Sequence, residues 1–230
     1  MMQTPGTEVG IPVGEIVLHG VLSRPPGARG MVVFAHGSGS SRTSPRNTYV
    51  ARVLAAAGFG SLLFDLLTVE EDRDYATRFD IGLLSLRLLG ATRWLRDDAK
   101  ASVLPLGYFG ASTGAAAALV AAAEPDAGVA AVVSRGGRPD LAGAHALGRV
   151  HAPTLLIVGG EDPEVILLNR AAYAELRCEK ELSIVPGATH LFEEPGTLES
   201  AARLAAAWFT RHLAGPAARG GAGVKPRPSS

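Results

Sequence analysis

The sequence predicts a single α/β domain built on a mainly parallel sheet that carries helices on both faces. Between residues 14 and 214, short β-type runs alternate with helical ones, which is the pattern that crossover helices between parallel strands produce. Most of the β-type runs are continuously apolar, as expected for strands that are covered on both faces. The length of 230 residues suits one domain with a substantial core.

The predicted elements follow one another in a regular order. We expect strands at residues 15–23, 31–36, 61–66, 105–110, 130–134, 154–159 and 182–187, the first of which can open the domain as a hairpin. We expect helices at residues 46–57, 80–98, 113–124, 164–177 and 196–213. In the last helix, apolar residues recur at spacings of three and four, so that one face can pack on the sheet.

The two ends of the chain differ from its centre. Residues 1–13 are expected to form an N-terminal extension, and residues 215–230, which are rich in Gly and Pro, a disordered tail. The first residues lack the basic and apolar segments of a secretory signal. The longest apolar run, Ala115–Ala123, falls well short of the roughly 20 residues that span a bilayer. We therefore expect a cytoplasmic protein with no membrane partner.

The charge balance restricts the class of ligand. Lys plus Arg and Asp plus Glu both number 22, so no net field favours nucleic acid, and we expect a small molecule as the ligand. The single cysteine, Cys178, excludes an intramolecular disulfide and any multi-cysteine metal site. No metal and no cofactor are expected.

Ser112 is the candidate nucleophile. It is the central residue of Gly110-Ala111-Ser112-Thr113-Gly114, which follows a predicted strand and precedes a predicted helix. This is the G-x-S-x-G nucleophile elbow in the strand-turn-helix context that it requires. The alternative is that these small residues only allow the helix to pack closely against the sheet.

The loop after the strand at 31–36 is the candidate oxyanion loop. It reads His36-Gly37-Ser38-Gly39-Ser40, and we expect the backbone N–H of Ser38, with that of Thr113, to bind the oxyanion. His36 is expected to hydrogen-bond the backbone and hold the loop in shape. The glycines do not match the spacing of either common nucleotide-binding motif, so nucleotide binding is not expected.

A carboxylate and a histidine follow the last two predicted strands. The turn at 159–163 offers Glu161 or Asp162 as the acid, and we prefer Asp162 because it completes a Gly-x-x-Asp turn before the next helix. Asp162 could also serve as a helix N-cap. His190, on the loop after the strand at 182–187, is the candidate general base. The chain order Ser, Asp, His is that of the α/β-hydrolases.

Four segments resemble the dienelactone hydrolase-like branch of the α/β-hydrolases, and the likeness runs from about Gly14 to Leu213. The segments are FAHGSGSS (34–41), GASTG (110–114), VGGEDPEV (158–165) and PGATHLF (186–192). The resemblance implies an α/β-hydrolase fold without a large lid domain, and hydrolysis of esters or lactones without a cofactor. The dienelactone hydrolases that give the family its name use a cysteine nucleophile, whereas this sequence has Ser112.

These residues predict a serine hydrolase that cleaves a carboxylic ester, lactone or thioester through an acyl-enzyme. An acyltransferase would use the same residues, and a non-catalytic binding module would keep only the fold. Six arginines follow predicted strands at the expected active-site edge: Arg42, Arg46, Arg73, Arg78, Arg135 and Arg138. Arg135 and Arg42 are candidates to bind an anionic group of the substrate. The alternative is that these arginines pair with acidic residues on the same loops.

Overall fold

The computed structural model describes residues 6–98 and 101–213, which form an eight-stranded sheet in the order β1-β2-β4-β3-β5-β6-β7-β8. The strands are β1 (Thr7–Val13), β2 (Ile16–Ser23), β3 (Met31–Ala35), β4 (Gly60–Phe64), β5 (Leu106–Ala111), β6 (Val129–Arg135), β7 (Thr154–Gly159) and β8 (Lys180–Val185). From β4 to β8 in this order, all neighbouring strands are parallel, whereas β2 runs antiparallel to both β1 and β4. The predicted α/β architecture is confirmed.

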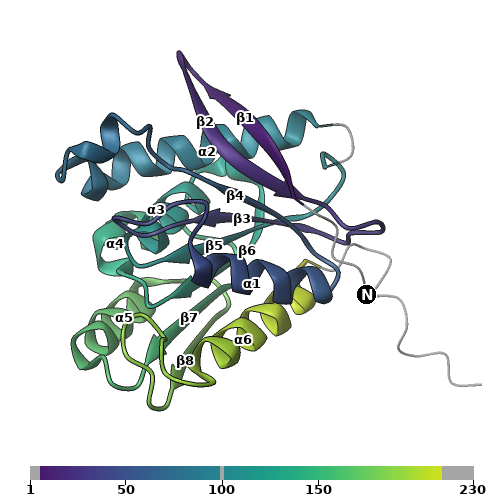
Figure 1. The fold of residues 1–230 in the computed structure, drawn as a ribbon. Coiled ribbons are helices and arrows are strands. Elements are labelled where there is room, and N and C mark those ends of the chain that lie inside the picture. The colour runs from purple at the N-terminus through teal and green to yellow at the C-terminus, as the bar shows by residue number, and fades with distance from the viewer. Residues whose placement is uncertain (1–5, 99–100, 214–230) are drawn as a thin grey trace, which may run out of the picture.

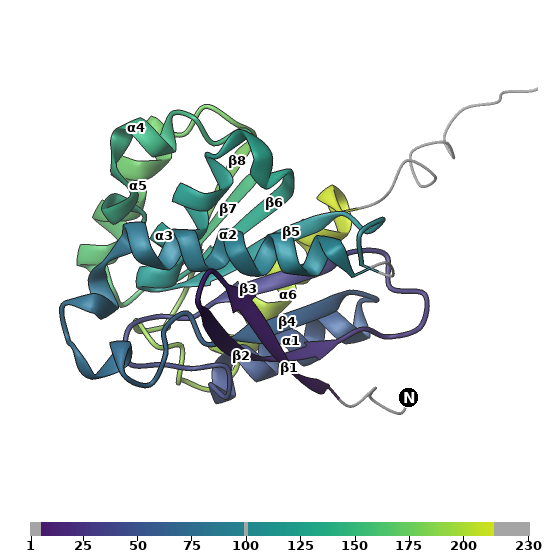
Figure 2. The same cartoon turned by 90° about the horizontal axis from the view of Figure 1, so that it is seen from above.

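Helices cover both faces of the sheet. They are α1 (Pro45–Ala56), α2 (Ile81–Asp97), α3 (Thr113–Ala122), α4 (Gly143–Leu147), α5 (Pro163–Glu175) and α6 (Thr197–His212). Figures 1 and 2 show α1 and α6 together on one side and α2 and α3 on the other. Each side has its own hydrophobic core, which explains why apolar residues on both faces of the central strands are buried.

The N-terminal boundary differs from the prediction. Residues 7–13, expected ahead of the domain, form the edge strand β1 and pair with β2 from Thr7↔Leu22 to Val13↔Ile16. The hairpin therefore turns at Gly14 and lies across 7–23, not within the predicted run at 15–23. Pro12 is tolerated because an edge strand can spare a backbone donor. The predicted tail at 215–230 lies outside the described residues.

The other strands and the longer helices begin and end within two residues of the predicted bounds. Sequence reasoning missed α4 and four short 3-10 helices: η1 (Glu71–Arg73), η2 (Thr77–Phe79), η3 (Pro125–Ala127) and η4 (Pro139–Ala142). These elements lie in loops, where one or two turns leave no clear periodicity. Two of them, η1 and η2, lie in the segment between β4 and α2.

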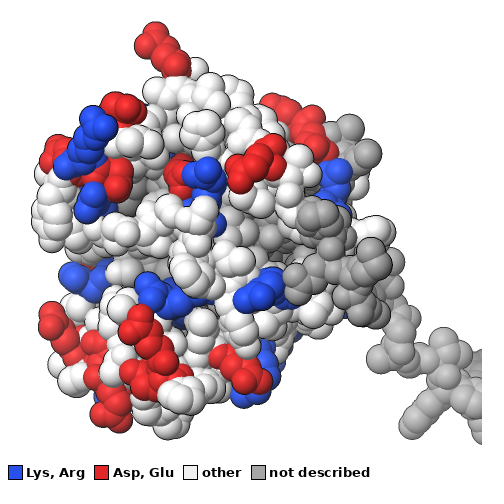
Figure 3. All heavy atoms as spheres, in the orientation of Figure 1, with Lys and Arg blue, Asp and Glu red and all other residues white. Residues whose placement is uncertain are grey.

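The surface carries charges of both signs. On the face in Figure 3, basic and acidic side chains are interspersed and neither sign covers the face. No helix within 6–98 or 101–213 is long and apolar enough to cross a membrane.

Candidate active site

Ser112 lies on a sharp turn between β5 and α3. Its backbone has φ 50° and ψ −124°, a conformation that side-chain-bearing residues rarely adopt. The turn requires glycine on both sides of the serine. A Cβ at Gly110 would lie 2.4 Å from the Cα of Ala115, and a Cβ at Gly114 would lie 2.2 Å from the carbonyl oxygen of Ala35. The strain and the close packing hold the hydroxyl at the end of the sheet, as a nucleophile elbow requires.

His190 lies between Ser112 and Asp162. Its Nε2 is 3.4 Å from Ser112 Oγ, and its Nδ1 is 2.8 Å from Asp162 Oδ2. With Nδ1–H donating to the carboxylate, Nε2 is free to accept the serine proton. The serine contact is at the long end of the hydrogen-bond range, which is common before substrate binds.

The acid loop brings Asp162, and not Glu161, to the histidine. Asp162 precedes α5 at the N-cap position, but its side chain makes no capping hydrogen bond. Glu161 is exposed, and its backbone N–H donates to the carbonyl of Ala188, 2.9 Å away. The acid loop and the histidine loop pack directly on each other, since a Cβ at Gly159 would lie 2.3 Å from the same carbonyl oxygen.

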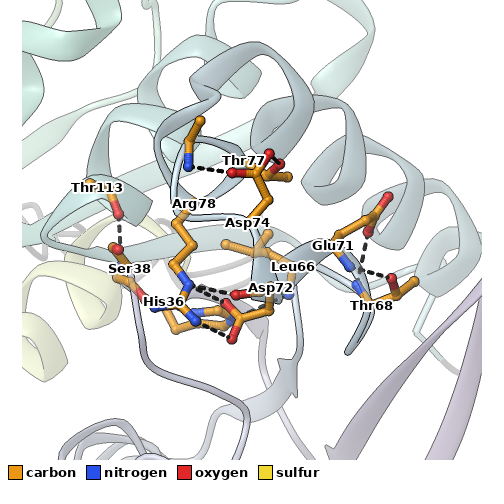
Figure 4. A network of polar contacts seen from close by, with 12 residues as sticks. His36, Ser38, Leu66, Thr68, Glu71, Asp72, Asp74, Thr77, Arg78 and Thr113 are labelled. Atoms are coloured by element: carbon orange, nitrogen blue, oxygen red, sulfur yellow. Dashed lines mark hydrogen bonds and ion pairs between the residues drawn. The ribbon is translucent and has the colours of Figure 1, made fainter.

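The loop after β3 also contacts Ser112. A Cβ at Gly37 would lie 2.9 Å from the Cβ of Ser112, so only glycine allows the loop to come this close. The N–H of Thr113 is at the first position of α3, where it has no acceptor within the helix. The N–H of Ser38 differs from the expectation: it donates to the side-chain Oγ1 of Thr113, 2.9 Å away (Figure 4).

His36 holds the loop after β3 by two contacts with backbone groups. Its Nδ1 lies 2.9 Å from the carbonyl oxygen of Gly37 and its Nε2 accepts the N–H of Leu66 at 3.0 Å. A neutral imidazole with its proton on Nδ1 satisfies both contacts. Burial lowers the pKa of His36 below its usual value of 6.5. The expected loop-holding role of His36 is confirmed.

Sequence reasoning did not predict that residues 65–80 lie beside this loop. Figure 4 shows the side chain of Arg78 reaching toward it from η2. The Nε of Arg78 donates to the carbonyl oxygen of Asp72 at 2.8 Å and its Nη2 to Asp72 Oδ2 at 3.0 Å. A Cβ built on Gly39 would lie 3.9 Å from Arg78 Nη1, so the guanidinium lies close to the backbone of this loop.

Most of the arginines singled out from the sequence pair with carboxylates. The pairs are Arg42 with Asp65 and Glu8, Arg46 with Glu193, Arg78 with Asp72, and Arg138 with Asp140. Arg73 is exposed. The alternative of pairing within the same loop therefore describes Arg78 and Arg138, whereas Arg42 and Arg46 pair with acids from other segments. The guanidinium of Arg42 is held by Asp65.

Arg135 is the one buried arginine of the six. It is 5% exposed, and within the described part of the chain it has no carboxylate partner; Nη1 approaches the carbonyl oxygen of Leu191 at 3.4 Å. Its guanidinium carbon lies 5.5 Å from the centre of the Phe192 ring. Burial and, secondarily, the charge of Arg46 lower the pKa of Arg135 to about 10. The guanidinium thus lies against the loop that carries His190.

The chain after Arg135 also meets the histidine loop. Gly136 has φ 50°, and a Cβ there would lie 2.9 Å from the carbonyl oxygen of His190. Across the described ranges, no group of three or more His, Cys, Asp or Glu side chains could hold a metal ion. The groups that the site offers for chemistry are a serine, a histidine and a carboxylate, each within hydrogen-bond distance of the next.

Known proteins resemble the chain over almost its whole length. The crystal structure of a dienelactone hydrolase from Anabaena variabilis has 57% sequence identity and a TM-score of 0.88, covering 92% of this chain and 100% of that one. Est1E from Butyrivibrio proteoclasticus, at 15% identity, has a TM-score of 0.76 and covers 90% of this chain and 99% of its own; it supports the fold alone. No family model matches the chain.

The curated relatives are longer proteins. One from Mycobacterium tuberculosis is 60% identical over 213 residues, which are 93% of this chain and 48% of the relative. It carries the provisional name of a phosphoribosyl transferase. The chain therefore spans about half the length of the curated relatives it matches.

Proposed function

Because the chain belongs to the dienelactone hydrolase-like family of α/β-hydrolases, we propose that it is a serine hydrolase that cleaves a carboxylic ester, lactone or thioester. One observation carries the proposal: His190 lies within 3.4 Å of Ser112 Oγ and 2.8 Å of Asp162 Oδ2. A scaffold that only binds a ligand has no need of this alignment, or of the strained backbone at Ser112.

The reaction passes through an acyl-enzyme. His190 Nε2 takes the proton of Ser112 as Oγ attacks the carbonyl carbon, and Asp162 stabilises the imidazolium that forms. The tetrahedral intermediate then collapses, and the same proton goes from His190 to the leaving alcohol or thiol. Water, deprotonated by His190, attacks the acyl group, and the proton returns to the serine as the acid is released.

The substrate is proposed to be small and to carry an anionic group. Arg135 supports this proposal because a buried guanidinium without a carboxylate is costly unless another anion offsets its charge. Its planar fork suits a carboxylate or a phosphate. Arg42 is not included, since Asp65 and Glu8 already neutralise it.

Acyl transfer to an alcohol or a thiol is the second candidate, because the acyl-enzyme would accept either nucleophile in place of water. The transferase name of the mycobacterial relatives refers to proteins about twice as long as the matched region, so we propose that it refers to their other half. Product analysis separates the two reactions. With p-nitrophenyl acetate, free acetate as the main product in the presence of added alcohols and thiols supports hydrolysis, and acetylated acceptor as the main product supports transfer.

A further inference from the structure

The side chain of Thr113 connects the two halves of the proposed oxyanion site. Thr113 begins α3, directly after the nucleophile, and the residue is 3% exposed. Its Oγ1 accepts the backbone N–H of Ser38, which comes from the loop after β3 (Figure 4). The two segments are fixed against each other, since a Cβ at Gly114 would lie 2.4 Å from the carbonyl oxygen of His36.

The hydroxyl proton of Thr113 has no acceptor among the residues that the structure describes. A threonine hydroxyl offers one donor and two acceptor lone pairs. The Ser38 N–H uses one lone pair, and this is the one hydrogen bond of the Thr113 side chain within 6–98 and 101–213. A buried hydroxyl that accepts but does not donate is available to a group that arrives from outside.

We propose that the Thr113 hydroxyl donates its proton to the substrate oxyanion, together with the Thr113 backbone N–H. This inference rests on the proposed function. The Ser38 N–H continues to donate to Thr113 Oγ1. This hydrogen bond orients and polarises the hydroxyl, and so strengthens the hydrogen bond that the hydroxyl donates to the oxyanion. Ser38 is thus a positioning residue, and Thr113 supplies both donors.

The hydroxyl stabilises the transition state more than the bound ester. An O–H donor to a full negative charge makes a shorter and stronger hydrogen bond than one to a neutral carbonyl. The charge on the substrate oxygen develops only as Ser112 attacks. Loss of the hydroxyl therefore lowers kcat and leaves KM nearly unchanged.

The test compares Thr113→Val, which replaces the hydroxyl with a methyl group, and Thr113→Ser, which keeps it. We expect kcat for p-nitrophenyl acetate to fall by about 10²–10³ in the valine variant, the effect of removing one oxyanion donor, and by less than about tenfold in the serine variant. The inhibition constant of phenylboronic acid, which forms a tetrahedral serine adduct, should rise in parallel with the loss in kcat. Thr113→Ala gives the same comparison if valine does not fit.

Thr92→Val is the matched control. Thr92 is also a buried threonine, but its hydroxyl bonds Tyr108 and Leu88 within α2 and β5, away from the nucleophile. Its kcat should equal that of the wild type at temperatures where the protein is folded.

Two results would overturn the inference while the proposed function stands. Wild-type activity, or higher, in Thr113→Val would mean that the hydroxyl only fills the space in front of the Ser38 N–H. Equal losses in the valine and serine variants would mean that the shape of the side chain, and not its hydroxyl, supports the rate, because serine keeps the hydroxyl. If the wild type neither hydrolyses esters nor reacts with a fluorophosphonate, the proposed function fails and the inference fails with it.

Discussion

The carboxylate of Asp162 lies 2.8 Å from His190 Nδ1, although Asp162 occupies the position from which a side chain normally caps α5. The carboxylate makes no capping bond, so the helix gains nothing from it directly. Pro163 at the start of α5 compensates in part, because proline at this position needs no acceptor. The contact with the histidine is therefore the main interaction of this side chain.

Asp162→Asn should lower kcat by about 10³–10⁴, because an amide cannot stabilise the imidazolium and favours the wrong tautomer of His190. Glu161→Gln is the matched control, since Glu161 is the exposed neighbour of Asp162 and should lose less than about threefold. Steady-state kinetics on a p-nitrophenyl ester checks both variants. A larger loss in Glu161→Gln would mean that the acid is misassigned.

EDTA should not change the rate, since the proposed reaction uses no metal ion. A rate that falls in EDTA and returns with a divalent cation would contradict this mechanism.

His36 should make the protein less stable in acid. Burial holds the pKa of His36 below 6.5, so the unfolded chain takes up the proton first as the pH falls. The contribution of His36 to stability is complete above about pH 6.5 and declines as the pH falls through the lower pKa of the folded state. Urea unfolding of His36→Gln should show a smaller decline between about pH 7 and 5 than the wild type.

His19→Gln is the control for this measurement, because His19 is exposed on β2. It should keep the wild-type pH dependence. An unchanged pH dependence in His36→Gln would show that the imidazole of His36 is not the group that titrates.

Arg135→Ala should reduce kcat/KM for a carboxylate-bearing ester at least about tenfold more than for its neutral analogue, the scale of a charge-assisted contact. Arg138→Ala is the comparison, because Asp140 already binds that guanidinium, 2.8 Å away. Equal losses of kcat/KM on both esters in Arg135→Ala would instead mean that Arg135 has a structural role, in which it holds the loop of His190 through the carbonyl of Leu191.

The sequence predicted the central strands well because β3 to β7 are covered on both faces, so that most of their positions are apolar. The prediction missed β1, a largely solvent-exposed strand, because Gly10 and Pro12 are residues that strands disfavour. Ser112, Asp162 and His190 could be singled out because each lies in the turn or loop that follows a strand, and the carboxyl ends of parallel strands meet at one edge.

Contacts between residues far apart in the sequence could not be predicted. The Ser38–Thr113 hydrogen bond joins residues 75 positions apart, and no local pattern marks it. The sequence likewise offered several acids for each arginine. Loop conformation gave Arg42 a carboxylate and left Arg135 with a carbonyl and an aromatic ring.

Labelling by a fluorophosphonate, which reacts only with an activated serine, tests the central claim most directly. We expect the wild-type protein to gain one label, and peptide mass spectrometry to locate it on Ser112. Ser112→Ala should take up no label and lose about 10⁴–10⁶ in ester hydrolysis while it unfolds at the wild-type temperature. Labelling of another residue, or hydrolysis at the wild-type rate by Ser112→Ala, would contradict the account.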